Sequence, residues 1–525
     1  MTKDKIASSY DELPYQSHPY SQTSPENLAT LGEFFGMNPP VIKSARILEL
    51  GSAAGGNIIP HAINYPKSKC IGIDLSKVQI DEGTKDIKAI GLNNVELKHC
   101  SITDIDETFG KFDYIICHGV FSWVPDFIQD KILEIANKNL TDNGIAYISY
   151  NTLPGWNMVR TIREMMMYHT KDIKDSNTKI VQARALLEFV KDSLEGNESS
   201  YAKLLAEETE LLSKQPDYYI RHEHLEGENT QFYFKEFITK AEKNNLQYLS
   251  DSFLASMYLG NLSKPAVEKL NNLNDIIRVE QYMDFITNRR FRGTLLCHNT
   301  IPLNRNLNSD IIKKFALSMD ITAEKPLSEV DLEKDEALKF YFKESKENFI
   351  STTSSSLKSV FYTFDENKGS TLSFNKLVKK ANAKLKNNKL PQIEIDLQNS
   401  ALELIMRGYM AICLFTRDKD KVKLAKPHLT KLALYQINNT NNDWVTNSRH
   451  SSIAINIFDK FALKHMNGKN TKQDILNYLF KDVKDGNLNF TRENKNIEDP
   501  NEIKKELTEH LDHSIKKFHI NGVLR

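Results

Sequence analysis

The chain has 525 residues, of which 40% are hydrophobic and 26% are charged, so it is long enough for several domains with packed cores. Lysine plus arginine and aspartate plus glutamate each total 69, so the net charge does not indicate a nucleic-acid-binding or membrane-surface protein. The five cysteines show no zinc-ligand spacing, and no apolar run reaches the length of a membrane span. These features predict a soluble cytoplasmic protein with no metal site and no membrane insertion.

The N-terminal segment is rich in tyrosine, proline and serine. Residues 8–23 are expected to be irregular, and Ser24 followed by Pro25 predicts a helix that ends at Gly36. Such an arm could fold over a ligand site, where Tyr15 and Tyr20 would contact the substrate, or it could pack elsewhere on the domain.

Two short apolar runs, 46–50 and 70–73, are separated by a segment that can form a helix. Continuous apolar runs of this kind are typical of buried parallel strands, so the stretch predicts a βαβ unit. The first run contains Glu49 and opens onto the loop Gly51-Ser52-Ala53-Ala54-Gly55-Gly56, and the second leads into Asp74.

This loop differs from a dinucleotide-binding fingerprint, which would have glycine in place of Ala53. The acid before the loop would repel a pyrophosphate, whereas it suits a ligand with a cationic end and a ribose. S-adenosylmethionine (AdoMet) has both, so the pattern predicts the cofactor loop of a class I methyltransferase; the alternative is a structural turn without a ligand. The expected cofactor contacts here are Glu49, Gly51, Ser52, Ala53, Gly55, Asp74 and Leu75.

Three further strands are predicted at 94–99, 112–117 and 145–150, which completes an α/β, Rossmann-like pattern. Ligands of such sheets bind outside the carboxyl ends of the strands. Ser101 and Ile102 follow the third strand and should therefore contact the adenine.

Two of the three tryptophans, Trp123 and Trp156, come shortly after consecutive strands. Either one alone could simply pack beneath the loops. Together with His118, Tyr150 and Asn151, which lie at the same strand ends, they indicate the rim of a substrate site.

Beyond Arg160 the pattern becomes helical. The long amphipathic run 177–212 could cross between domains or pair with a partner helix, so a dimer contact is predicted there. His222-x-His224 would lie on one face of a strand, and without a third ligand nearby it does not predict a metal site. Residues 281–297 interleave aromatic and basic side chains, but the neighbouring acids favour an internal ion network over a nucleic-acid surface.

The C-terminal part begins with a polar connector at 299–325. A strand at 359–364 (SVFYTF) and helices follow, and a second segment, 452–525, contains helices and a strand at 487–490 (NLNF). This order is typical of winged-helix domains. The lysine-rich run 376–389 is more typical of a solvated helix face than of a DNA-binding surface.

Six stretches of the chain, taken in order, carry a family resemblance: SYDELPYQSHPY, RILELGSAAGGNIIP, IGIDLSKVQI, FDYIICHGVFSWVP, AYISYNTLPGW and QYMDFITNRRFRGTLLC. They resemble bacterial methyltransferases that carry a methyltransferase regulatory domain. The layout is similar to that of the rickettsial protein-lysine methyltransferases, which modify an outer-membrane surface protein.

The resemblance implies four regions. These are an α/β Rossmann-like, AdoMet-binding methyltransferase domain with the N-terminal arm (1–170), a mainly α-helical dimerisation and regulatory region (171–305), and two winged-helix-like domains (306–425 and 426–525). It also implies a homodimer, and it places His118 and Gly119 beside the sulfonium. The chain lacks the Asn-Pro-Pro-Tyr signature of amide and nucleobase methylation after the fourth strand.

Methylation of lysine requires a neutral amine, because the lysine pKa of about 10.4 leaves the group protonated at neutral pH. A dry channel of Phe121, Trp123, Tyr150 and Trp156 would lower that pKa, and His118, Tyr150 or Asn151 could hydrogen-bond the amine. We therefore predict an AdoMet-dependent lysine methyltransferase that acts on an outer-membrane surface protein before export and releases S-adenosylhomocysteine (AdoHcy). The alternatives are a small-molecule or nucleic-acid methyltransferase and an AdoMet-sensing DNA-binding regulator.

Overall fold

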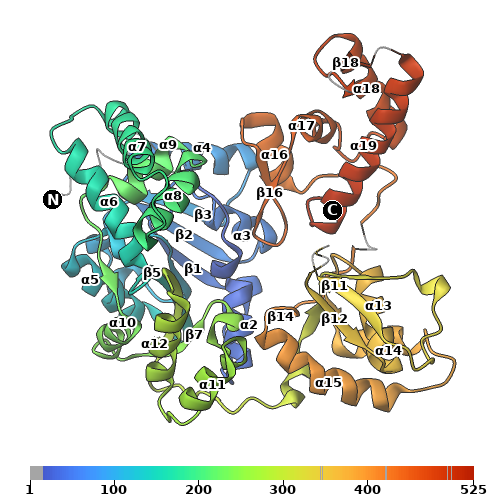
Figure 1. Cartoon of the computed structure of the whole chain (residues 1–525), viewed down its shortest axis with the longest axis horizontal. Helices are drawn as coiled ribbons and strands as arrows, with labels where there is room; N and C mark the ends of the chain where they lie inside the picture. Colours follow the sequence, from blue (N-terminus) through green and yellow to red (C-terminus); the bar gives the residue numbers. More distant parts are fainter. Residues whose placement is uncertain (1–15, 343–344, 346, 420–421, 493–494, 498) are drawn as a thin grey trace. The chain divides into compact units, whose positions relative to one another are not determined.

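A computed structural model describes residues 16–525 except 343–344, 346, 420–421, 493–494 and 498 (Figure 1). The described chain forms two compact units: the first comprises Gly36–Leu303 with the residues up to Ser17, and the second comprises His18–Phe35 with Asn304–Arg525. Helix α2 (Pro25–Phe34), expected as part of the methyltransferase arm, thus belongs to the second unit. No helix among the described residues is long and apolar enough to cross a membrane.

The first unit is built on one mixed sheet with the strand order β3-β2-β1-β4-β5-β8-β7. Strands β1 to β5 run parallel and confirm the five predicted strands, while β8 is antiparallel to both β5 and β7. Their bounds are β1 Arg46–Leu50, β2 Lys69–Asp74, β3 Val95–His99, β4 Phe112–Cys117, β5 Leu140–Thr152, β7 Leu246–Asp251 and β8 Phe291–His298. The order reverses between β1 and β4, and ligands bind at such a reversal.

A short strand, β6 (Gln231–Phe232), runs parallel to the end of β5. The main core lies on the sheet face that packs against α5 (Asp126–Lys138) and α10 (Phe234–Glu242). The other helices of the unit are α3 Ile58–Asn64, α4 Lys77–Ile90, α6 Trp156–Thr170, α7 Ser176–Ser193, α8 Ser200–Ser213, α9 Asp217–Tyr219, α11 Lys264–Leu270 and α12 Ile276–Thr287. The long helical run predicted at 177–212 is therefore two helices, α7 and α8.

His222 and His224 do not lie on a strand. They belong to a π-helical turn, Ile220–His224, and both side chains are buried. The described residues contain no cluster of side chains that could hold a metal ion.

A buried ion network joins β8 to α12, as the mixture of aromatic, basic and acidic residues predicted. The Arg292 guanidinium lies 2.9 Å from Asp284 and 2.8 Å from Glu280, and packs 3.9 Å from the centre of the Phe234 ring. Arg292, Asp284 and Glu280 are each at most 1% exposed. Charges at this depth are stable only when they are paired and hydrogen-bonded.

The second unit contains two consecutive groups of helices and strands. The first has β9 Ala316–Ser318, β10 Ile321–Ala323, β11 Leu338–Phe342, β12 Phe349–Thr352, α13 Ser355–Glu366, β13 Leu372–Ser373, α14 Phe374–Asn382, α15 Leu390–Met406 and β14 Ala411–Cys413. The second has α16 Lys431–Asn439, β15 Trp444–Thr446, β16 Ser452–Ala454, α17 Ile457–Lys464, α18 Lys472–Lys484, β17 Thr491–Arg492, β18 Lys495–Asn496 and α19 Pro500–Ile520.

Three sequence expectations for this unit are corrected. Residues 359–364, expected as a strand, lie in α13, all of them buried, so a hydrophobic helix was mistaken for a strand. The expected connector 299–325 includes β9, the central strand of the sheet β13-β9-β14. Residues 487–490 follow the end of α18 without strand pairing, and the hairpin lies at β17 and β18.

We expect Arg292→Met to lower the free energy of unfolding of the first unit by about 3–5 kcal/mol, because the buried Glu280 carboxylate loses its cation and Asp284 keeps only Arg289. Urea unfolding followed by tryptophan fluorescence in a Trp444→Phe background would report on Trp123 and Trp156, both in the first unit. The matched control is Arg160→Met, which removes an exposed pair with Glu164 and should cost no more than about 0.5 kcal/mol. Equal midpoints for the two variants would contradict the prediction.

Candidate active site

The loop after β1 is held in place by the end of β2. The backbone N–H groups of Gly51 and Ser52 both donate to the carbonyl of Ile73, each at 2.9 Å. Gly51 has φ +75°, and a Cβ on it would lie 2.4 Å from Cγ2 of Val120. Glycine is therefore required at position 51, both by the left-handed backbone and by the close approach of the segment that follows β4.

Asp74, predicted to bind the ribose, also fixes the loop. Its carboxylate accepts hydrogen bonds from the N–H of Ala53 at 2.8 Å and of Ser76 at 2.9 Å. Ala53 itself has φ +48°, a conformation that a non-glycine residue adopts only when its surroundings hold it there. A carboxylate has about four acceptor positions, so Asp74 can brace the loop and still accept from ribose hydroxyls.

Glu49 lies buried at the end of β1, only 3% exposed. Its Oε1 accepts a hydrogen bond from Asn57 Nδ2 at 2.7 Å, whereas Oε2 has no hydrogen-bond partner among the described residues. Burial raises the pKa of this carboxyl to about 8. A buried acceptor without a partner, which a cation would keep ionised, fits the α-ammonium group of AdoMet.

Ser101 and Ile102, the predicted adenine contacts, lie at the carboxyl end of β3, where Ile102 opens a 3₁₀ turn. The Ser101 hydroxyl accepts from the N–H of Thr103, and Asp104 accepts from the N–H of Ser101. The carbonyl oxygen of Leu75, the residue after Asp74, lies 3.1 Å from Nε2 of His99. These contacts fix the backbone at the carboxyl ends of β2 and β3.

His118 and Gly119 follow β4 and face β5. Nδ1 of His118 lies 3.1 Å from the Tyr147 hydroxyl and 3.2 Å from the Ser149 hydroxyl, and the N–H of Gly119 donates to Ser149 at 2.8 Å. Burial lowers the pKa of His118 to about 4, so the imidazole is neutral at neutral pH. The Phe291 ring stands edge-on to it with the centroids 6.0 Å apart.

Tyr150 and Phe121 lie elsewhere than the sequence predicts. Tyr150 stacks on Phe237 at 4.0 Å and its hydroxyl is 3.0 Å from that of Thr294, while Phe121 is fully buried against Phe232 and Phe237. Side chains alternate along a strand, so Tyr150 points into the core beneath α10, away from the face that carries Tyr147 and Ser149. Neither ring lines an open channel.

Trp123 and Trp156 do come together, edge to face with centroids 6.3 Å apart. Trp156 Nε1 donates to Asn229 Oδ1 at 3.0 Å. Asn151 is buried on the Ser149 face of β5; its N–H donates to Ser122 Oγ, and its Nδ2 has no partner among the described residues. Tyr15 lies outside the described residues, and Tyr20 belongs to the second unit.

Sequence reasoning missed Tyr147, Ser149 and Asn57. Asn57 directly follows the loop, at the N-cap of α3, where no motif distinguishes it. The other two could have been found, because period-two alternation from Asn151 leads back to Ser149 and Tyr147 on the same face.

The sheet order, the loop after β1 and the buried acid define a class I, AdoMet-dependent methyltransferase. Three family models match the chain: "Methyltransferase domain" over residues 42–230, "Predicted methyltransferase regulatory domain" over 216–298, and "PKMT, C-terminal winged helix domain" over 425–523.

Two relatives cover almost the whole chain. The uncharacterized protein RP789 of Rickettsia prowazekii is 53% identical over 518 residues, which are 98% of this chain and 93% of RP789. The structure of PKMT2 from Rickettsia typhi in complex with AdoHcy is 41% identical, covers 97% of this chain and 100% of that one, and superimposes with a TM-score of 0.89. The chain belongs to this rickettsial PKMT family of methyltransferases. A third relative, the uncharacterized protein RP028 of R. prowazekii, is 51% identical over 249 residues, 47% of this chain and 100% of RP028.

We expect the affinity for AdoHcy to rise with pH between about pH 6 and 7.5, because binding the ligand's ammonium requires the Glu49 carboxyl to lose its proton. Release of one proton allows a change of up to about tenfold per pH unit. Titration calorimetry at several pH values would measure it. Glu49→Gln should bind more weakly and without the slope, whereas Glu82→Gln, on the exposed side of α4, should keep it. A wild-type slope in Glu49→Gln would refute the role of this carboxyl.

Proposed function

We propose that the chain is a protein-lysine N-methyltransferase that modifies lysines of an outer-membrane surface protein. The observation that supports it best is the neutral, hydrogen-bonding group of His118, Tyr147 and Ser149. This group adjoins the cofactor loop through Val120. The segment after β4 that carries His118 also carries Trp123, whose ring meets that of Trp156 at the start of α6. The hydrogen-bonding group offers polar contacts for an amine without adding a charge.

AdoMet supplies a methyl group already activated on a sulfonium. The protein has to align the acceptor and exclude water, and such positioning can account for several kcal/mol of the barrier. A lysine must arrive as the neutral amine, and a positive sulfonium together with partly dry surroundings lowers its pKa. Because His118 is neutral at neutral pH, it does not repel the amine, and its oriented ring can help to place the nitrogen.

The roles of the candidate residues follow from their positions. Trp123 and Trp156 form the apolar wall for the lysine stem, and Asn151 offers an amide on the face of β5 that carries Ser149. Tyr147 takes the hydrogen-bonding role that the sequence suggested for Tyr150, since only Tyr147 contacts His118.

The size of the accessory regions supports a polypeptide substrate. Such a substrate would be unfolded before export, so we propose that the reaction takes place in the cytoplasm. The accessory regions also support a homodimer formed through the helical hairpin α7–α8. Val181 and Phe189 on α7 are 62% and 67% exposed, and Tyr201 and Leu211 on α8 are also exposed. Apolar side chains presented by neighbouring helices are typical of a protein interface.

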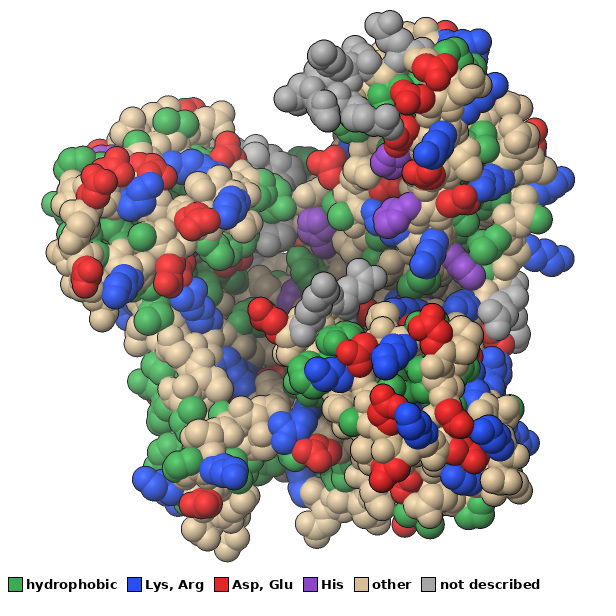
Figure 2. All heavy atoms as spheres, turned by 45° about the vertical axis from the view of Figure 1, so that its right-hand side comes forward, with side chains coloured by type: hydrophobic (Ala, Val, Ile, Leu, Met, Phe, Trp, Pro, Cys, Tyr) green, Lys and Arg blue, Asp and Glu red, His purple; other side chains and the backbone are tan. Residues whose placement is uncertain are grey.

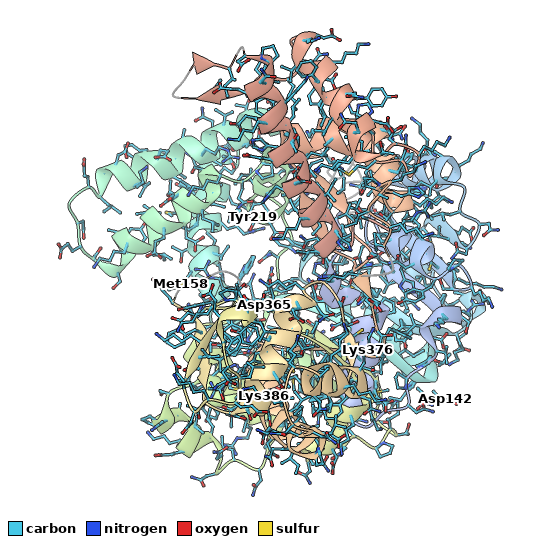
Figure 3. The ribbon with its side chains drawn as sticks, turned by 90° about the vertical axis from the view of Figure 1, so that its right-hand side faces the viewer. Asp142, Met158, Tyr219, Asp365, Lys376 and Lys386 are labelled. Carbon is cyan, nitrogen blue, oxygen red and sulfur yellow. The ribbon has the colours of Figure 1, made fainter. Side chains whose placement is uncertain are left out.

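The winged-helix domains raise the alternative of a DNA-binding regulator, which the lysine-rich run 376–389 does not favour. Lys376 pairs with Asp418, Lys384 with Glu366 and Lys386 with Asp331. Figure 3 labels Lys376 and Lys386. Figure 2 likewise shows basic and acidic side chains intermixed on the visible face of the second unit. Charges neutralised in this way provide little of the phosphate attraction on which DNA binding depends.

The decisive test is an assay with radiolabelled AdoMet and an unfolded fragment of an outer-membrane surface protein, followed by mass spectrometry of the labelled residues. We expect methyl-lysine from the wild type and almost none from Asp74→Ala, which loses both the loop brace and the ribose contact. Labelling of a small-molecule extract without any methyl-lysine would overturn the proposal.

Trp123→Ala should separate binding from transfer. We expect kcat on the protein substrate to fall by about 10²-fold or more, as misplacement of an acceptor does, with little change in the Kd for AdoHcy. Single-turnover kinetics and calorimetry measure the two quantities. The matched control is Phe127→Ala, which removes an aromatic side chain on α5 that is 65% exposed. Equal losses of AdoHcy binding and of transfer would sink the acceptor-wall role.

A further inference from the structure

A groove of about 640 Å³ lies in the first unit along β6 and between α10 and α12, which pack side by side (Figure 1). All residues that line it fall between 230 and 285, inside the match to the methyltransferase regulatory domain. None of the site residues described above takes part in it.

The wall of the groove is aromatic and exposed. Tyr233 and Phe285 meet edge to face with centroids 5.9 Å apart, and Tyr282 meets Phe285 in the same way at 5.8 Å. Tyr233 is 36% exposed and Phe285 is 45% exposed. Aromatic side chains left open beside a groove are characteristic of binding surfaces, because they bury much area at a low cost in side-chain entropy.

A buried polar group in the groove lacks a partner. Gln281 lines it and is only 8% exposed; its Oε1 accepts from the N–H of Lys235, but its Nε2 donates to no group among the described residues. A buried amide donor without an acceptor costs free energy, which a ligand carbonyl or carboxylate in the groove would recover.

The rim of the groove is positive. Lys235 and Thr239 on α10 and Lys243 at its C-cap recur every four residues and so form one row on the helix surface. Lys240 pairs with Asp126 and Asp130, and Glu236 accepts from the N–H of Tyr233. Within the described part of the chain, no carboxylate lies in ion-pair range of Lys235 or Lys243, so these two cations remain for a ligand.

We propose that this groove docks an extended acidic segment of the polypeptide substrate, with an aromatic or aliphatic side chain against Phe285 and a carboxylate near Lys235 or Lys243. The inference rests on the proposed function. The groove is also joined to the acceptor side: Thr230 at its edge donates from its N–H to the carbonyl of Ser122, the neighbour of Trp123, at 2.7 Å. A segment held here would bring its neighbouring lysines to the methyl-transfer site.

The test uses the full chain and a short fluorescent peptide with one phenylalanine flanked by aspartates, measured by anisotropy. Phe285→Ala/Lys243→Glu should weaken binding by about tenfold or more, and binding should weaken with added salt. The matched control, Phe253→Ala/Lys269→Glu, changes an exposed aromatic and an exposed lysine away from the groove and should bind as the wild type does. Replacing phenylalanine by serine, or aspartate by lysine, in the peptide should also reduce binding.

Kinetics then separate this inference from the proposed function. With the acidic segment joined to an acceptor lysine, the groove variant should raise KM several-fold and leave kcat on N-acetyl-lysine amide unchanged. Unchanged KM and unchanged peptide binding, with methyl-lysine still formed, would overturn the groove and leave the function standing. Peptide binding that depends on the groove, with no methyl-lysine formed, would overturn the function and leave the groove standing.

Discussion

The arrangement of the active site depends on one carboxylate buried where the sheet order reverses. Glu49 is held at the end of β1 with one oxygen paired and the other without a partner. The loop beside it has used its backbone donors, since the N–H groups of Gly51, Ser52 and Ala53 all bond to the end of β2. Phosphate-binding loops of the same topology keep such donors for the anion. A buried acid beside a loop whose backbone donors are already bonded disfavours a phosphate and favours a cation. This is consistent with AdoMet, the cofactor of class I methyltransferases.

The acceptor side depends on the alternation of side chains along β5. Tyr147, Ser149 and Asn151 share one face with His118, whereas Ile148 and Tyr150 enter the core beneath α5 and α10. The aromatic packing of Tyr150, Phe237 and Phe121 therefore supports the site from below and does not line it. Each of these core rings packs against several others, and this close packing fixes the position of β5. The polar side chains on the opposite face of β5 are therefore held in position as well.

The sequence allowed the five parallel strands, the cofactor loop and the ion network of Arg292 to be predicted, because each has a local signature: continuous apolar runs, glycines with an acid, and basic residues beside acids. It failed where tertiary context overrides composition. Five of the residues 359–364 are β-branched or aromatic, but all six are buried in a helix, where periodicity cannot distinguish helix from strand. The π-helical turn at His222 and His224 has no sequence signature. The pairing of His118 with Tyr147 brings together residues from two strands, so only the register of β4 and β5 reveals it.

The end of β5 is also the point where the regulatory region joins the catalytic sheet. Strand β6 pairs in parallel with Asn151 and Thr152, and β8 pairs with the same stretch from the other side. Phe232 of β6 packs against Phe121, and the N–H of Thr230 donates to the carbonyl of Ser122. The groove and the segment that carries Trp123 are thus both attached to β6. The two proposed sites are therefore attached to the same strand end through paired backbone. A substrate segment bound in the groove would then bring to the methyl-transfer site only lysines that lie a certain number of residues from it along the substrate chain. Which lysines react would therefore depend on their distance from the docked segment as well as on the local sequence.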